Sequence, residues 1–140
     1  MERSKVLRGL STISFYASDI EKATEWYSDF LEIQPYFKVP GYVEFRLGDY
    51  QHELGIIDSC YAPKNSTQNI GGAIAYWHVD DLEATFTTLI SKGAIVHEPI
   101  IDRSNGNMAF VTASVVDPFG NILGIMTNKH YLEILQQTKS

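Results

Sequence analysis

The stretch Val79-Asp80-Asp81-Leu82-Glu83-Ala84 decides how the rest of the sequence is interpreted. It follows an apolar run over residues 72–78 and opens an amphipathic segment that ends at Gly93. A similar stretch, Ala17-Ser18-Asp19-Ile20-Glu21-Lys22, comes earlier, and the offset from residue 19 to residue 81 is 81 − 19 = 62. In each copy, a run typical of a strand is followed by a segment whose apolar residues have helical spacing. We therefore predict one strand–helix unit that is used twice.

The composition is that of one folded domain. The chain has 140 residues, and its hydrophobic content of 44% is enough to form a sizeable core. The net charge of −6, the sequence pI near 5.1 and the scattered lysines and arginines exclude nucleic acid as the main partner. No apolar run approaches the roughly 20 residues of a membrane span, so we expect no membrane partner.

The lack of a recognisable secretory signal and the single cysteine predict a cytoplasmic protein. No long apolar region follows the first residues, as a secretory signal would require. Cys60 is the single cysteine, so no internal disulfide can form. It opens a polar connection in which nothing nearby would make the thiol reactive, and we expect it to have no catalytic role.

The first half of the sequence predicts the order strand, helix, strand, strand, strand. Ser18 is predicted to cap the helix, with Glu21 three residues later completing a capping box. Pro40-Gly41 and Gly48-Asp49 are turn signals that separate the later strands. The expected elements are a strand over 10–17, a helix over 19–31, and strands over 33–39, 42–47 and 51–57.

The second half repeats this order. Asp80 is predicted to cap the second helix, with Glu83 at its third position, and Gly93 is predicted to end it. Residues 98–107 are polar and predict a loop, and Asp117-Pro118-Phe119-Gly120-Asn121 is a turn signature. The expected elements are a strand over 73–79, a helix over 81–91, strands over 94–97, 108–115 and 122–127, and a short C-terminal helix over 129–137.

These elements form two modules within a single domain, 1–140. The modules span about 10–58 and 73–127, a polar linker over 59–72 joins them, and residues 128–140 form a tail or helix. Each half is too small to hold a good core alone, so we do not expect two independent domains.

Three motifs carry a resemblance to a known family. They are Asp19-Ile20-Glu21-Lys22-Ala23 followed by Trp26-Tyr27, then His78-Val79-Asp80-Asp81-Leu82-Glu83-Ala84, and finally Val116-Asp117-Pro118-Phe119-Gly120-Asn121 before a strand. In this order the chain resembles the glyoxalase/bleomycin-resistance/dioxygenase group, the vicinal oxygen chelate (VOC) superfamily. The resemblance implies an α+β fold of two βαβββ modules that form a cupped, barrel-like mixed sheet. It also implies a small-molecule pocket inside the cup and pairing into a homodimer.

Metal-dependent members of that family hold a divalent metal through strand residues on the concave face. In such members the ligand positions correspond to Thr12, Ile74, Gly124 and Gly55 of this sequence. None of these residues is a His or a carboxylate, the usual ligands of such a metal. We therefore predict no metal centre and no cofactor. The alternative is a divalent metal with displaced ligands, in which Glu53 substitutes through a register shift of two.

Other polar residues share strand faces with these positions. Glu53 is a candidate catalytic base, and His78 is a candidate acid or base whose other interpretation is a rim residue bonded to backbone or to a carboxylate. Glu44 and Arg46 alternate on one strand and are interpreted as a charged pocket floor with Glu53 or as a solvated outer face. The predicted ligand-binding residues are Thr12, Arg46, Tyr76, Ile74, Phe110 and Gly124.

Three functions follow from this interpretation and stay open. The first is a metal-free member of the superfamily that binds a small organic molecule, as resistance proteins do by sequestration. The second is an enzyme in which Glu53, His78 or a tyrosine abstracts a proton beside a carbonyl, with or without a loosely held metal. Its metal-dependent form is a lyase, isomerase or dioxygenase of the same superfamily with displaced ligands. The third is a non-catalytic subunit or sensor. The motifs do not identify the substrate, because one fold hosts many unrelated reactions.

Overall fold

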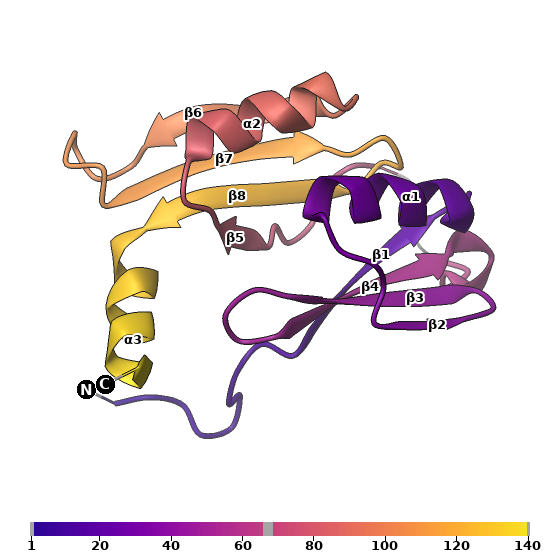
Figure 1. Cartoon of the computed structure of the whole chain (residues 1–140), viewed down its shortest axis with the longest axis horizontal. Coiled ribbons are helices and arrows are strands. Elements are labelled where there is room, and N and C mark those ends of the chain that lie inside the picture. The colour runs from indigo at the N-terminus through magenta and orange to yellow at the C-terminus, as the bar shows by residue number, and fades with distance from the viewer. Residues whose placement is uncertain (1, 66–68, 140) are drawn as a thin grey trace. The chain divides into compact units, whose positions relative to one another are not determined.

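The computed structural model describes residues 2–65 and 69–139. The chain divides into two compact units, Met1–Ala62 and Pro63–Ser140, each of which holds one four-stranded sheet. Within each unit the chain runs strand, helix, strand, strand, strand, as Figure 1 shows. The predicted α+β class and the βαβββ order of both halves are confirmed.

The first unit has a mixed sheet in the order β1-β4-β3-β2. Strand β1 is parallel to β4, whereas β4, β3 and β2 are successively antiparallel. A short 3-10 turn, η1 (Ser59–Tyr61), follows the last strand. The other elements are β1 (Thr12–Ala17), α1 (Ile20–Leu31), β2 (Phe37–Val39), β3 (Tyr42–Leu47) and β4 (His52–Asp58).

The second unit repeats the topology in the order β5-β8-β7-β6 and adds a C-terminal helix. Strand β5 is parallel to β8, and the β6–β7 and β7–β8 pairs are antiparallel. Its elements are β5 (Tyr76–His78), α2 (Leu82–Ser91), β6 (Ile95–Asp102), β7 (Phe110–Val116), β8 (Ile122–Asn128) and α3 (Lys129–Lys139).

Alternation along the strands separates an apolar face from a polar face in the first sheet. The apolar face packs on α1, which Figure 1 shows running along the sheet, and the rings of Phe15 and Tyr27 lie 6.2 Å apart there. This face includes the buried residues Val43, Phe45, Leu54 and Ile56. The opposite face, called the first polar face below, carries Thr12, Tyr42, Glu44, Arg46 and Glu53.

The second sheet is divided in the same way. Helix α2 contacts β6, β7 and β8, and its Leu82 and Leu89 are buried. The buried residues that share one face of strands β7 and β8 are Val111, Ala113, Val115, Leu123 and Ile125. The opposite face of this sheet, the second polar face, carries Tyr76, Thr112, Ser114 and Gly124.

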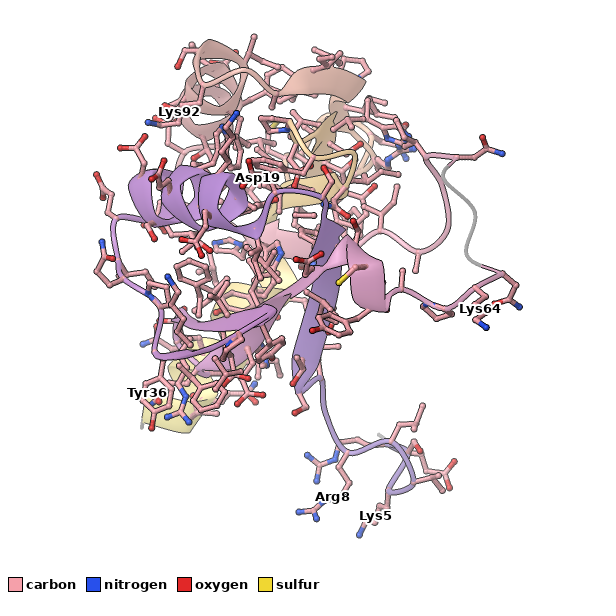
Figure 2. The ribbon with its side chains drawn as sticks, turned by 90° about the vertical axis from the view of Figure 1, so that its right-hand side faces the viewer. Lys5, Arg8, Asp19, Tyr36, Lys64 and Lys92 are labelled. Carbon is pink, nitrogen blue, oxygen red and sulfur yellow. The ribbon has the colours of Figure 1, made fainter. Side chains whose placement is uncertain are left out.

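The cap of each helix lies one residue later than predicted. Asp19 caps α1 and accepts a hydrogen bond from the Lys22 backbone N–H at 3.1 Å, and Figure 2 labels it at the start of the helix. Asp81 caps α2 and accepts from the Ala84 N–H at 3.0 Å. The predicted caps Ser18 and Asp80 are therefore wrong. In both modules the carboxylate of the cap lies next to the positive end of the helix dipole, which stabilises the helix start.

Several strand boundaries also differ from the prediction. Strand β2 begins at Phe37 and β5 at Tyr76, so both are shorter than predicted. The predicted loop over 98–107 is wrong for its first part, because β6 continues to Asp102. Two register irregularities in the β6–β7 pair accommodate Pro99, which a regular central strand would not tolerate.

None of the helices in the described ranges is long and apolar enough to cross a membrane.

We predict that the Asp19→Ala and Asp81→Ala substitutions each lower the free energy of unfolding by about 0.5–2 kcal/mol. Each removes the side-chain acceptor that satisfies an N–H group in the first turn of its helix. Chemical denaturation followed by circular dichroism measures the change. Ser18→Ala and Asp80→Ala are matched controls one residue away, with an expected change within about 0.5 kcal/mol. A loss at Ser18 equal to that at Asp19 would contradict the assignment.

Candidate functional site

Thr12 and Glu53 meet on the first polar face. They are paired residues of the parallel β1–β4 ladder, and the Thr12 hydroxyl donates a hydrogen bond to Glu53 Oε1 at 2.7 Å. Glu53 is half-buried, and Thr12 is exposed at the edge of the sheet. The structure thus brings together a predicted catalytic residue and a predicted ligand-binding residue, and it fixes one oxygen of the carboxylate.

Tyr42 forms a second hydroxyl–carboxylate pair on this face. Its hydroxyl donates to Glu44 Oε1 at 2.8 Å. Burial raises the pKa of Tyr42 to about 12, and the hydrogen bond to Glu44 and the negative charges of Glu44 and Glu53 add to the effect. The phenol therefore stays protonated at neutral pH and remains a hydrogen-bond donor. Tyr42 was not among the predicted site residues, although its place on the same strand face as Glu44 was a usable signal.

Arg46 lies on the same face, and its guanidinium contacts an aromatic ring. It pairs directly with Glu53 across the β3–β4 ladder, yet its guanidinium carbon stacks 3.5 Å from the centre of the Tyr36 ring. Tyr36 is 62% exposed, and Figure 2 labels it at one end of the first sheet. Among the residues that the structure describes, Arg46 forms no ion pair with Glu53. The face predicted as a charged floor therefore has its cation bound to an aromatic ring.

Gly55 lies on the first polar face, where the resemblance places a metal ligand. A Cβ added to Gly55 would stand 2.7 Å from the Tyr42 hydroxyl oxygen and 2.8 Å from its ring carbon Cε1. Because real Cβ atoms do not come that close to another atom, the Tyr42 side chain already fills the space that a residue here would occupy.

Gly124 occupies the equivalent position in the second module and is covered in a similar way. A Cβ on Gly124 would stand 2.7 Å from the Ala75 carbonyl oxygen, 2.7 Å from Tyr76 Cδ1 and 2.9 Å from Ile74 Cγ2. The predicted ligand-binding residues Tyr76 and Ile74 thus contact the space above Gly124. In both modules a tyrosine ring covers the glycine at this position.

These residues do not fit the divalent-metal centre that the resemblance implies. Gly55 and Gly124 have no side chain, and Ile74 has no donor atom. Thr12 has its hydroxyl proton engaged with Glu53. Such centres need imidazole, thiolate or carboxylate groups that converge on one point, and these four positions supply none.

His78 lies at the end of β5 in the second unit. Its Nδ1 accepts a hydrogen bond from the Asn128 backbone N–H at 3.1 Å, and its ring stacks on Tyr131 of α3 with centroids 4.8 Å apart. The backbone bond engages Nδ1, so only Nε2 is available to exchange a proton with a ligand. This is the geometry of the rim residue that the sequence analysis gave as the other interpretation.

The second polar face carries a set of contacts that the sequence analysis did not predict. His97 Nδ1 lies 2.9 Å from the Ser114 hydroxyl oxygen, and Arg103 Nε donates to Thr112 Oγ1 at 3.0 Å. Arg103 Nη2 also forms an ion pair with Glu98 at 3.2 Å. Glu98 and Arg103 were missed because residues 98–107 were interpreted as a loop. The pair Ile100-Ile101 after Pro99 was the signal that the strand continues.

The predicted site residues fall into two groups. Phe110, at the first position of β7, is 44% exposed and pairs with Asn128. The first unit holds Thr12, Arg46 and Glu53, and the second holds Ile74, Tyr76, His78, Phe110 and Gly124.

We predict that Gly124→Ala destabilises the protein by about 1–3 kcal/mol, the usual cost of forcing extra atoms into a packed site. Gly55→Ala should cost less, because its new methyl group meets the movable end of Tyr42, whereas that of Gly124 meets a backbone carbonyl. Thermal and chemical denaturation measure both changes. Gly9→Ala is the control, because nothing lies within 4 Å of a Cβ there. Equal stability of Gly124→Ala and Gly9→Ala would contradict this packing.

The fold of this chain is similar to that of solved structures. A glyoxalase-related enzyme from Fulvimarina pelagi is similar with a TM-score of 0.68 and 18% identity, over 87% of this chain and 89% of that chain. A lactoylglutathione lyase from Agrobacterium tumefaciens is similar with a TM-score of 0.66 and 20% identity, over 89% of this chain and 96% of that chain. At such identities the likeness concerns the fold.

Comparison at the level of sequence assigns the chain to a family. No protein of curated function matches the chain significantly. The family model of the Glyoxalase/Bleomycin resistance protein/Dioxygenase superfamily matches residues 9–125, which include both βαβββ repeats up to the last strand. The chain therefore belongs to the glyoxalase/bleomycin resistance protein/dioxygenase superfamily.

Proposed function

We propose that this protein binds a small organic molecule on the first polar face, without a metal centre at the strand positions described above. The observation that carries the proposal is the presence of two hydroxyl–carboxylate pairs, Thr12–Glu53 and Tyr42–Glu44, on one face of the sheet. Their hydrogen bonds hold polar atoms in fixed directions before a ligand arrives, which lowers the entropic cost of binding.

A pocket beside Glu53 supports this proposal. It has a volume of about 460 Å³ and lies between the segment before β1 and the turn before β4. Its volume falls within the range of about 300–1,000 Å³ that is common for small-molecule sites, and as a shallow, open hollow it covers one side of a small ligand. Arg8, Ser11 and His52 contribute to its wall, and Figure 2 labels Arg8 on the N-terminal segment.

The aromatic part of the pocket wall suits a flat group. The rings of Tyr50 and His52 lie 5.9 Å apart with an interplanar angle of 32°. Aromatic faces of this kind pack against planar apolar groups, while polar atoms nearby fix the orientation. Glu53 lines the same pocket and also belongs to the first polar face, so it connects the two.

Metal analysis tests the first part of the proposal. Protein purified without a chelator is expected to hold no stoichiometric zinc, nickel, manganese or iron, because the four strand positions lack ligating side chains. Inductively coupled plasma mass spectrometry measures the content. Stoichiometric metal in the native protein would contradict this part of the proposal. Its loss in Glu53→Gln would then identify Glu53 as a ligand.

Ligand screening tests the second part. A compound present at ~100 times its Kd should stabilise the protein by about 2.7 kcal/mol, which a thermal-shift screen of small metabolites detects. Glu53→Gln and Tyr42→Phe should reduce that stabilisation, because each removes one member of a hydroxyl–carboxylate pair.

Two substitutions away from the first polar face serve as controls for the screen. Glu83→Gln removes an exposed carboxylate on α2, and Tyr61→Phe removes a hydroxyl from a tyrosine that is also exposed. Both should leave the ligand-induced shift unchanged. Hits that keep their full shift in Glu53→Gln and Tyr42→Phe would show that the ligand binds elsewhere.

A further inference from the structure

The pocket beside Glu53 carries a cationic and an anionic side chain. Arg8 lies on the segment before β1 and Glu53 on β4, and both line this pocket of about 460 Å³. In the part of the chain that the structure describes, they form no ion pair with each other. Their charged atoms therefore lie more than 4.0 Å apart, which leaves room for a ligand group between them.

The hydrogen bonds around Glu53 make its side of the pocket a set of acceptors. Thr12 donates its one hydroxyl proton to Glu53 Oε1 at 2.7 Å. Ser11 Oγ lies 3.4 Å from Thr12 Oγ1, and because the Thr12 proton is already used, Ser11 is the donor in this long contact. The Glu53 backbone N–H is also engaged, since it donates to the Ser11 carbonyl oxygen at 3.0 Å. This side of the pocket offers lone pairs, which suit a ligand group that donates hydrogen bonds, such as an ammonium.

Arg8 has the opposite character. Its guanidinium has five N–H donors in one plane and no acceptor, a geometry that matches the two oxygens of a carboxylate. Arg46, the ladder partner of Glu53, stacks on Tyr36 and is not among the residues that line this pocket. Arg8 is therefore the arginine that a carboxylate in this pocket meets.

The remaining polar side chains of the pocket wall do not favour either charge. The Tyr50 hydroxyl, the Gln51 amide and a neutral His52 imidazole can each donate and accept hydrogen bonds. Tyr50 is 38% exposed, so part of its ring is open to a ligand. An aromatic group of a ligand packs well against such a surface.

We infer that this pocket binds a small aromatic zwitterion of the α-amino acid type. Its carboxylate pairs with Arg8, its ammonium pairs with Glu53, and its ring packs on Tyr50. This inference rests on the proposed function, because it names the ligand class of the same site. A ligand with one charge of each sign complements a pocket with one charge of each sign, so neither charge of the complex lacks a partner.

Three probes with the same ring and different charges test the inference. At neutral pH L-phenylalanine carries both charges, phenethylamine carries only the ammonium, and 3-phenylpropanoate carries only the carboxylate. Isothermal titration calorimetry of the full chain measures each affinity. Phenylalanine should bind about tenfold or more tighter than either of the other probes, because each of them lacks one hydrogen-bonded charge pair.

Two substitutions locate the two charges. Arg8→Gln should weaken phenylalanine and 3-phenylpropanoate by about tenfold or more, but phenethylamine by much less. Glu53→Gln should weaken phenylalanine and phenethylamine to the same extent, but 3-phenylpropanoate by much less. A variant that does not fold would lose all three probes, so these opposite patterns distinguish a lost contact from a lost structure.

Arg3→Gln and Glu21→Gln are the matched controls. Arg3 precedes β1 on the same segment as Arg8, and Glu21 is an exposed carboxylate of α1. Neither residue lines this pocket. Both substitutions should leave the affinities for all three probes unchanged.

Each outcome separates the ligand class from the function. Tightest binding of phenethylamine or of 3-phenylpropanoate, weakened in Glu53→Gln or in Arg8→Gln, would overturn the zwitterion and keep the pocket as a binding site. Phenylalanine binding that survives both substitutions, or no phenylalanine binding at all, would also overturn the inference. The proposed function fails separately if no compound in the metabolite screen responds to Glu53→Gln and Tyr42→Phe.

Discussion

The parallel pairing of β1 with β4 is the constraint on which the first module depends. It sets Thr12 opposite Glu53, and the antiparallel β3–β4 pairing then sets Glu53 opposite Arg46. Side chains alternate along a strand, so a slip of one residue would move Leu54 and Ile56 away from α1 and expose them to water. Burying these residues against the helix fixes the register, and the register in turn places the polar groups together on the other face. Packing on one side of the sheet thus positions the chemistry on the other.

Much of the fold could be predicted from the sequence because its signals are local and periodic. The alternation in 42–47 matches β3 residue for residue, and the helical spacing after residue 19 matches α1. The caps were misplaced by one residue because Ser18 and Asp19, like Asp80 and Asp81, are neighbouring residues that both suit a cap. Strand β6 was cut short because Pro99 is a turn signal in the sequence, whereas an irregular edge strand tolerates it.

The site was only partly predictable, because its contacts join strands that are far apart in the sequence. The alternation of side chains along each strand predicted that Glu53, Glu44 and Arg46 share one face. It could not show that Arg46 would stack on Tyr36. The ligand spacing of the resembled family identified the glycines at positions 55 and 124, yet the rings that cover them come from strands of different orientation. Tyr42 reaches Gly55 from an antiparallel neighbour strand, and Tyr76 reaches Gly124 from a parallel one. The two modules therefore fill equivalent space by different routes, which a repeat in the sequence does not show.

The irregular strand β6 has a consequence for how the protein behaves at high concentration. It is an edge strand of eight residues, and Ile95, Val96 and Ile100 on it are exposed. A long, regular, apolar edge would be a template on which the strand of another molecule could add and begin aggregation. Pro99 has no N–H group to offer, and the register irregularities on either side of Glu98 interrupt the row of backbone donors and acceptors. A newly made or crowded chain therefore has no continuous edge here for a neighbour to extend.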